Sequence, residues 1–231
     1  MTRPSKIAAI LLAAGGSTRM NGVDKIVAPL LGRSLLAYSL DLLAESASIE
    51  SIVVVAGEVN AEAVGSIANR TQTHKITAVC TGGSRRQDSV RSGLDHIDEA
   101  THVLVHDGAR PLIDAPLIAR AVRAMSDHDA AIAAVPVKDT IKMADDGMTV
   151  LETVPRNRLW TVQTPQIFEA GLLRLAHRSI DSDVTDDASM VEMLGHEVKL
   201  FMGSYENLKV TTPEDIVMAE AVLRSRSKVG V

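Results

Sequence analysis

The feature that most constrains the fold is a short apolar run near the N-terminus that leads into very small residues. Residues 7–12 are continuously apolar, as expected of a parallel strand that is buried on both faces of a sheet. Residues 13–17 carry little or no side chain, so their backbone N–H groups can approach an anion closely. Arg19 and Lys25 follow and supply positive charge. The segment therefore predicts a phosphate-binding turn at the end of the first strand.

Two common phosphate-binding patterns do not fit this turn. A P-loop reads GxxxxGK[ST] and a dinucleotide-binding turn reads GxGxxG, and neither spacing occurs here. An ordinary glycine turn after a core strand is the alternative, and the two nearby cations favour the anion site over it. A basic start before a short apolar stretch is also typical of a signal peptide, but the stretch is needed as the first strand of the sheet.

The composition restricts the classes of partner. The 231 residues, 46% hydrophobic and 23% charged, suit one α/β domain with a full core. A net charge of −5 and 2% aromatic residues disfavour nucleic acid, and no apolar run approaches the ~20 residues of a membrane helix. The sole cysteine, Cys80, cannot form an internal disulfide, so a reducing cytoplasm is expected. The predicted partner is a small anionic substrate in a locally cationic pocket.

Strands and helices alternate after the first turn. Strands are expected over 7–12, 51–56, 76–81, 102–106, 130–135 and 197–202, and helices over 34–47, 59–70, 87–97 and 114–126. This alternation predicts right-handed crossovers and a mainly parallel sheet. Ligands on such sheets bind beyond the carboxyl ends of the strands. The segments 13–19, 82–89 and 107–110 each follow a predicted strand, so we expect them to converge.

The alternation breaks between residues 137 and 165. Residues 140–143 and 149–154 read as two strands around Asp145-Asp146-Gly147, which is a hairpin turn signal. They contain few residues of core size, and an isolated hairpin is marginal in water. We therefore expect the hairpin to pack on another surface, such as a partner subunit.

Two helices are predicted near the C-terminus. Asp183 or Thr185 is expected to cap a helix that continues through Leu194. Thr212, followed by proline and two acids, is expected to open the last helix.

The segment after the third strand suits recognition of a base. Gly82 and Gly83 free the backbone for close contact, and Ser89 offers a neutral hydroxyl, so together they could distinguish cytosine from other bases. The alternative is a plain helix start in which Ser84 is the cap and the two arginines after it are solvated.

The segment after the fourth strand suits a ribose, a phosphate or a metal. Asp107 at the sheet rim can hold Mg2+, directly or through water, or bind a ribose hydroxyl. Gly108 and Ala109 leave room for the sugar, and Arg110 can grip a phosphate. The alternative is an Asp–Arg pair that caps a turn. Lys209, just before the last helix, is by itself typical of a solvated face.

Several motifs occur in a recognisable order: LLAAGGSTRM followed by Lys25, GGSRRQDSV, VHDGARP, VPVKDTIK, TVPRNRLWTVQTPQIF, TDDASMVE and ENLKVTTPEDI. Together they resemble the 2-C-methyl-D-erythritol 4-phosphate cytidylyltransferases of the non-mevalonate isoprenoid pathway. The opening loop also resembles sugar-nucleotide pyrophosphorylases, whereas the VPVKDTIK and TPQ segments are more specific. The resemblance covers most of the chain.

The resemblance implies a Rossmann-like nucleotidyltransferase domain over 1–231, with an inserted arm at about 137–158 that is exchanged within a homodimer. It implies Mg2+ dependence and transfer of a cytidylyl group from CTP to 2-C-methyl-D-erythritol 4-phosphate, giving a CDP-alcohol in isoprenoid precursor biosynthesis, with release of pyrophosphate. The triphosphate contacts it implies are Ala13, Ala14, Gly15, Arg19 and Lys25. The cytosine contacts are Gly82, Gly83 and Ser89, and the ribose contacts are Asp107, Gly108 and Ala109. The acceptor contacts are Arg110, Thr140, Arg156, Thr164 and Lys209, of which Thr140 and Arg156 come from the partner subunit's arm. The expected catalytic residues are Arg19, Lys25, Arg156 and Lys209, and Asp107 is the expected metal ligand.

Two other functions remain open on the sequence. A ribitol 5-phosphate cytidylyltransferase would share most CTP contacts and differ only in the acceptor pocket. A catalytically silent nucleotide-binding domain on the same fold is the second alternative, since a fold does not assign a function. The presence together of Arg19, Lys25, Asp107 and Lys209 disfavours that second alternative.

Overall fold

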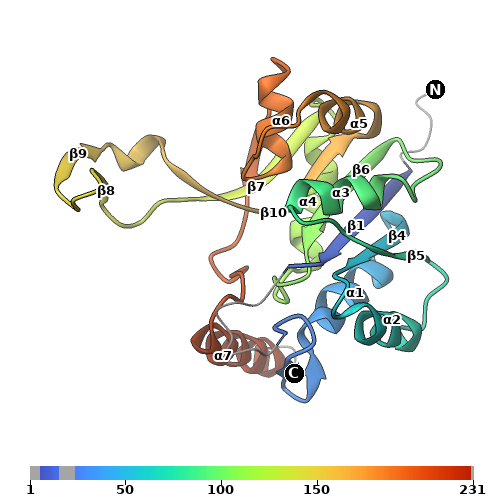
Figure 1. Cartoon of the computed structure of the whole chain (residues 1–231). Helices are drawn as coiled ribbons and strands as arrows, with labels where there is room; N and C mark the ends of the chain where they lie inside the picture. Colours follow the sequence, from blue (N-terminus) through green and yellow to red (C-terminus); the bar gives the residue numbers. More distant parts are fainter. Residues whose placement is uncertain (1–5, 16–23, 230–231) are drawn as a thin grey trace.

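The protein is built around a seven-stranded sheet in the order β11-β7-β10-β6-β1-β4-β5, seen here in a computed structural model that describes residues 6–15 and 24–229 (Figure 1). Its strands are β1 Ile7–Ala13, β4 Ile49–Ala56, β5 Ile76–Thr81, β6 His102–Asp107, β7 Ala130–Pro136, β10 Trp160–Glu169 and β11 Lys199–Met202. Every pair of neighbours is parallel except those of β10, which runs antiparallel to both β6 and β7. The predicted mainly parallel sheet is confirmed.

Helices cover both faces of this sheet. They are α1 Leu35–Glu45, α2 Ala61–Arg70, α3 Arg86–Leu94, α4 Ala115–Ala124, α5 Ala170–Ser179 and α6 Asp187–Met193. Apolar side chains of α1, α2 and α4 pack on one face, while those of α3, α5 and α6 pack on the other. The strands are therefore buried on both sides, which explains why β1 and β4 are almost continuously apolar.

The last helix packs outside these layers. α7, Pro213–Val229, lies against the small hairpin of β2 Pro29–Leu30 and β3 Arg33–Ser34 through a third apolar cluster that includes Leu30 and Ala219. Within residues 6–15 and 24–229, no helix has the length and apolar character to cross a membrane.

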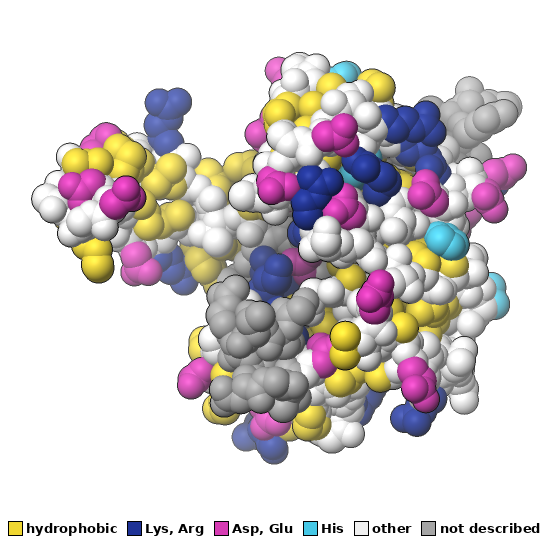
Figure 2. Space-filling model, viewed as in Figure 1, with side chains coloured by type: hydrophobic (Ala, Val, Ile, Leu, Met, Phe, Trp, Pro, Cys, Tyr) yellow, Lys and Arg dark blue, Asp and Glu magenta, His cyan; other side chains and the backbone are white. Residues whose placement is uncertain are grey.

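A two-stranded arm projects from the body of the molecule (Figure 1). It consists of β8 Ile141–Ala144 and β9 Val150–Val154, followed by the short 3-10 helix η1 Arg156–Arg158. Met148 and Leu151 on it are 89% and 61% exposed, and apolar side chains are spread over its surface (Figure 2). The predicted hairpin and its lack of a core are confirmed.

Three local predictions are wrong. The cap of α6 is Asp186, not Asp183 or Thr185, because the carboxylate of Asp186 accepts the backbone N–H of Ser189 at 3.0 Å. Helix α2 begins at Ala61 instead of residue 59, since the side chain of Asn60 bonds back to the preceding turn. Helix α3 begins one residue earlier than predicted and ends at residue 94 instead of 97.

The sequence analysis also missed β10 and α5. Strand β10 carries polar residues that are buried, namely Gln163, Thr164 and Gln166. These interrupt the apolar pattern by which a buried strand is recognised.

Candidate functional site

Three adjoining cavities lie at the carboxyl ends of the parallel strands. The glycine cavity, about 380 Å³, is lined by Gly82, Gly57 and Asn60, and the central cavity, about 190 Å³, is lined by Lys25 and Ser89. The outer cavity, about 410 Å³, is lined by residues of β10 and α6, among them Thr164 and Ser189. Figure 2 shows cationic and anionic side chains next to each other in a hollow near the middle of the view.

Shared lining residues join these cavities into one row. The glycine and central cavities share Ala14, Gly15, Gly83 and Ser84. The central and outer cavities share Arg86, Asp107 and Lys209, which we call the junction. The expected convergence of the segments after β1, β5 and β6 is therefore confirmed for their described residues.

Asp107 lies at the centre of the junction, at the end of β6. Lys209 Nζ is 2.8 Å from its Oδ2, Arg86 Nε is 3.4 Å from its Oδ1, and Arg110 Nε is 3.9 Å from Oδ2. Burial alone would raise the pKa of Asp107, but Arg86, Lys209 and Arg110 more than offset it and hold the pKa well below its usual range. Asp107 is therefore a carboxylate surrounded by cations.

The backbone of Asp107 is held by a buried network. Its N–H donates to the Thr164 hydroxyl at 3.0 Å, and that hydroxyl lies 3.1 Å from Nδ1 of His106. Nε2 of His106 lies 3.2 Å from the carbonyl oxygen of Arg110. Burial lowers the pKa of His106 to about 4, so its imidazole is neutral at pH 7. A neutral ring suits both contacts, because it donates through Nε2 and accepts through Nδ1.

Close packing explains three of the predicted glycines. A Cβ on Gly82 would lie 2.5 Å from Ser89 Oγ, and one on Gly83 would lie 2.4 Å from Asp88 Cβ. A Cβ on Gly108 would lie 2.8 Å from the carbonyl oxygen of Leu12. Larger residues would push the strand ends and α3 apart at the cavities.

Most of the predicted site residues lie in or beside the row of cavities. Those that line at least one cavity are Ala14, Gly15, Lys25, Gly82, Gly83, Ser89, Asp107, Ala109, Arg110, Thr164 and Lys209. Ala13 and Gly108 are buried directly behind the lining. Arg19 lies outside the described residues.

Thr140 and Arg156 are the exceptions. Both are exposed residues of the arm region, and neither lines any of the three cavities. Arg156 instead donates to the carbonyl oxygen of Lys138 within the same arm. The subunit's own fold does not bring these two residues to the site.

The sequence analysis did not include Arg86, or the buried residues that contact it, among the candidate site residues. Arg86 Nη1 lies 2.6 Å from Asp187 Oδ2, and Asp187 Oδ1 lies 3.0 Å from His177 Nε2. The sequence alone offers Arg86 only as a solvated residue at a helix start, yet it lines both cavities at the junction. No local signal could have found it, because Arg85 follows the same paired glycines and contacts different acids.

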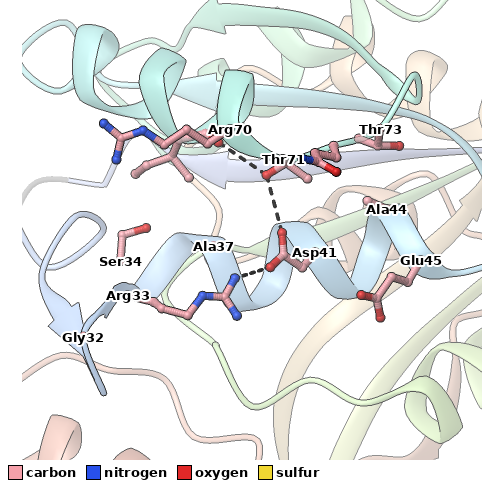
Figure 3. A pocket seen from close by; sticks show the side chains of 12 residues that line it. Gly32, Arg33, Ser34, Ala37, Asp41, Ala44, Glu45, Arg70, Thr71 and Thr73 are labelled. Carbon is pink, nitrogen blue, oxygen red and sulfur yellow. Dashed lines mark hydrogen bonds and ion pairs between the residues drawn. The ribbon is translucent and has the colours of Figure 1, made fainter.

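A larger cavity lies away from the row. It occupies about 590 Å³ between α1 and α2, where Arg33 pairs with Asp41 and the Thr71 hydroxyl donates to Asp41 at 3.4 Å (Figure 3). None of the predicted site residues lines it. The row of three smaller cavities is therefore the candidate functional site, in accordance with the position of ligands on parallel sheets.

The described residues of the site offer few side-chain ligands for a metal ion. Nowhere in the described part of the chain do three histidine, cysteine, aspartate or glutamate side chains gather to hold an ion. Asp107 supplies the carboxylate of the junction. Such a site suits a cation that takes its remaining ligands from substrate phosphates, as Mg2+ commonly does.

Comparison with known proteins agrees with this geometry. The model of the 2-C-methyl-D-erythritol 4-phosphate cytidylyltransferase family matches residues 7–225. The proteins of that name from Dehalococcoides mccartyi and Halalkalibacterium halodurans are 43% and 42% identical, with 95% of this chain and 96% and 97% of theirs covered.

Solved structures give the same result. The 4-diphosphocytidyl-2C-methyl-D-erythritol synthase of Anaerococcus prevotii aligns with a TM-score of 0.84 at 31% identity, covering 96% of this chain and all of that one. The 2-C-methyl-D-erythritol 4-phosphate cytidylyltransferase of Thermus thermophilus aligns with a TM-score of 0.76 at 32% identity, covering 95% of this chain and 99% of that one. With a matching fold and sequence over nearly its full length, the chain belongs to the 2-C-methyl-D-erythritol 4-phosphate cytidylyltransferase family.

Proposed function

We infer that the protein transfers the cytidylyl group of CTP to 2-C-methyl-D-erythritol 4-phosphate, giving 4-diphosphocytidyl-2-C-methyl-D-erythritol and pyrophosphate in isoprenoid precursor biosynthesis. The observation that carries this inference is the junction, where two cavities meet at Arg86, Asp107 and Lys209. A transfer between two bound phosphates needs such a meeting point. The sole cysteine is unpaired, and we place the reaction in the cytoplasm.

The chemistry requires positioning more than proton transfer. An oxygen of the acceptor phosphate forms a bond to the α-phosphorus of CTP while the bond from that phosphorus to the bridging oxygen breaks, and pyrophosphate leaves. The attacking oxygen is already nucleophilic at neutral pH, so no general base is needed. The protein must hold two polyanions in line and stabilise the charge between them.

The cavities suggest a division of roles among the predicted residues. Ala14, Gly15 and Lys25, together with Arg19, hold the triphosphate. Gly82, Gly83 and Ser89 form the neutral edge for cytosine, with Asp107, Gly108 and Ala109 on the ribose side. In the outer cavity, Arg110, Thr164 and Lys209 receive the acceptor phosphate, and Lys209 lines both sides of the junction.

Completing the acceptor site requires the arm of a second copy. Thr140 and Arg156 lie on an arm with exposed apolar residues such as Met148 and Leu151. Burying these side chains against a partner of the same kind would stabilise a two-fold dimer. We propose that the arm, at about 137–158 of one nucleotidyltransferase domain, is exchanged within a homodimer and delivers both residues to the partner's outer cavity.

A divalent metal is implied by membership in this nucleotidyltransferase family, and we propose Mg2+. Asp107 would hold it, directly or through water, with phosphate oxygens as the other ligands. When bound, the ion neutralises part of the triphosphate charge.

Pyrophosphate release tests the proposed function. Each nucleoside triphosphate is assayed against methylerythritol phosphate and against ribitol 5-phosphate. CTP with methylerythritol phosphate should give the highest kcat/KM, about 100-fold or more above UTP, because a site built for one hydrogen-bond pattern leaves groups unpaired with the other. Equal values for CTP and GTP contradict the base assignment. A higher kcat/KM with ribitol 5-phosphate would identify the protein as a ribitol 5-phosphate cytidylyltransferase. If no pair of nucleotide and acceptor releases pyrophosphate, the protein is a catalytically silent nucleotide-binding domain.

A further inference from the structure

Two motifs of the sequence meet behind the junction through a pair of charged side chains. Arg86, from the paired-glycine motif, reaches Asp187, from the TDD motif, with Nη1 and Oδ2 2.6 Å apart. The side chain of Asp187 is fully buried, and its other oxygen lies 3.0 Å from Nε2 of His177. Asp187 therefore lies one layer behind the cavity wall, where it contacts a residue that does line the cavities.

The neighbouring aspartate ties the same helix to the outer cavity. Asp186 caps α6 through Ser189 and accepts a hydrogen bond from Nε2 of Gln166 at 2.8 Å. Gln166 belongs to β10, two residues after Thr164. The two acids of the motif thus divide their contacts: the first fixes the position of α6 against β10, and the second reaches Arg86.

The carboxylate of Asp107 depends on this arrangement. Its Oδ1 lies towards Arg86 at 3.4 Å, while its Oδ2 lies towards Lys209 at 2.8 Å. A guanidinium is a rigid fork that can contact Asp187 and Asp107 at the same time, which the single ammonium of a lysine cannot match in geometry. Arg86 therefore couples the buried anchor to the reacting end of the site.

Burial of their charges keeps the side chains of Arg86 and Asp187 in contact. Burial would raise the pKa of Asp187, but Arg86 and His177 more than offset it and lower the pKa. The guanidinium of Arg86 lies between two carboxylates, 2.6 Å from Asp187 Oδ2 and 3.4 Å from Asp107 Oδ1, and its side chain is 24% exposed. Both groups stay charged, and a buried charge without its partner is costly, so Arg86 is held against Asp187.

We propose that Asp187 is a positioning residue for the transfer reaction, acting through Arg86 to hold Asp107 and Lys209 at the junction. This inference rests on the proposed function. Gly82 and Gly83 of the proposed base edge line the glycine cavity, which Arg86 does not line. Loss of the anchor should therefore lower kcat by a larger factor than it raises the KM for CTP, as for an interaction that matters mainly in the transition state.

A double-mutant cycle tests the coupling. Asp187→Asn and Arg86→Lys should each lower kcat by about 10-fold to 100-fold, the range seen when a residue that orients a site group is removed. The double variant should be no worse than the poorer single variant by more than about twofold, because both changes break one chain of contacts. Losses that multiply, or an Arg86→Lys enzyme with wild-type kcat, would overturn the proposal.

Controls separate positioning from folding. Asp181→Asn makes the same change of carboxylate to amide in another Asp–Arg pair, 3.5 Å from Arg91, but its side chain is 86% exposed, so kcat should be unchanged. The stoichiometry of CTP binding, measured by calorimetry, gives the fraction of folded sites in each variant. If Asp187→Asn does not fold, Arg86→Lys is compared with Arg86→Met. Equal kcat losses support the bridge, and near-complete recovery by lysine shows that only the charge matters, which overturns it.

The proposal and the proposed function fail differently. A wild-type enzyme that releases no pyrophosphate removes the function, and the positioning role with it. An active wild type whose two variants lose kcat independently removes the positioning role alone.

Discussion

Asp187 and Thr164, at the junction side of the molecule, are almost completely buried, whereas Met148 and Leu151 on the arm expose most of their surface. Around the junction, each polar side chain is held by specific partners within the same subunit, such as Arg86 for Asp187. On the arm, the side chains predicted to serve catalysis reach none of the cavities. In the proposed acceptor site, Arg110, Thr164 and Lys209 are thus brought together by the subunit's own fold, whereas Thr140 and Arg156 would have to come from a second copy.

The two regions also differ in what a substitution should cost. Removing one partner of a buried polar pair leaves the other without a hydrogen bond. The free energy of unfolding then falls by more than the net contribution of the original interaction. Exposed arm residues lose little when changed, because water replaces the lost partner. Changes around the junction should therefore affect folding and turnover, while changes on the arm should affect turnover through the partner subunit.

The largest effect is expected for Lys25→Ala, which removes a cation from the central cavity. Charge shifts toward the leaving pyrophosphate in the transition state, so kcat should fall by about 100-fold to 1,000-fold, the loss typical of one preorganised donor. Steady-state kinetics at saturating CTP on folded protein measure it. A kcat within about threefold of wild type would mean that Lys25 serves only the structure.

Acid should lower the stability of the fold through the buried His106 beside the junction. The pKa of His106 is about 4 in the folded protein because of burial, against about 6.5 for an unperturbed histidine. Between these values the unfolded chain binds more protons, so stability falls as pH decreases from about 6.5 to 4, by up to about 3 kcal/mol. Urea melts across this range should give a shallower pH slope for His106→Gln. An identical pH slope in the variant would contradict the assignment of the slope to His106. The arm at 137–158 contains no histidine, so it has no group that titrates in the same way.

Subunit mixing tests whether the arm completes a partner's site. Lys25→Ala and Arg156→Ala subunits should each be inactive alone. Random exchange should form heterodimers with one composite site that holds both residues, restoring about a quarter of the wild-type activity per subunit in a two-fold dimer. Native mass spectrometry confirms the exchange. Heterodimers that form and stay inactive would place Arg156 outside the shared site.

The smallest effects form a matched pair of threonine substitutions. Thr164→Val leaves the buried N–H of Asp107 without its acceptor and should lower the free energy of unfolding by about 1–3 kcal/mol. Thr153→Val removes an exposed hydrogen bond of the arm, in which Lys142 Nζ donates to Thr153 Oγ1 at 2.6 Å. This substitution should change the free energy of unfolding by about 0.5 kcal/mol at most. Chemical denaturation compares them. Equal costs would remove the contrast between the two regions.

The sequence by itself indicated six of the seven strands of the sheet, the hairpin of the arm and eleven of the residues that line the three cavities. Continuous apolar runs such as 7–12 report burial on both faces, and small residues after a strand report close backbone approach to a ligand. Both signals are local, so they can be interpreted without knowing what packs against them. Gly82, Asp107 and Lys209 were found in this way or by resemblance to a family.

Only the tertiary structure decided which charges meet. Arg86 and Asp187 are 101 residues apart, and nothing local distinguishes Arg86 from Arg85, whose guanidinium contacts Asp88 and Asp183 instead. Strand β10 was missed for the same reason, since its buried Gln166 is satisfied by Asp186 on a distant helix. A buried polar residue is stable only through partners that the fold supplies, so its role cannot be seen in its own segment of sequence.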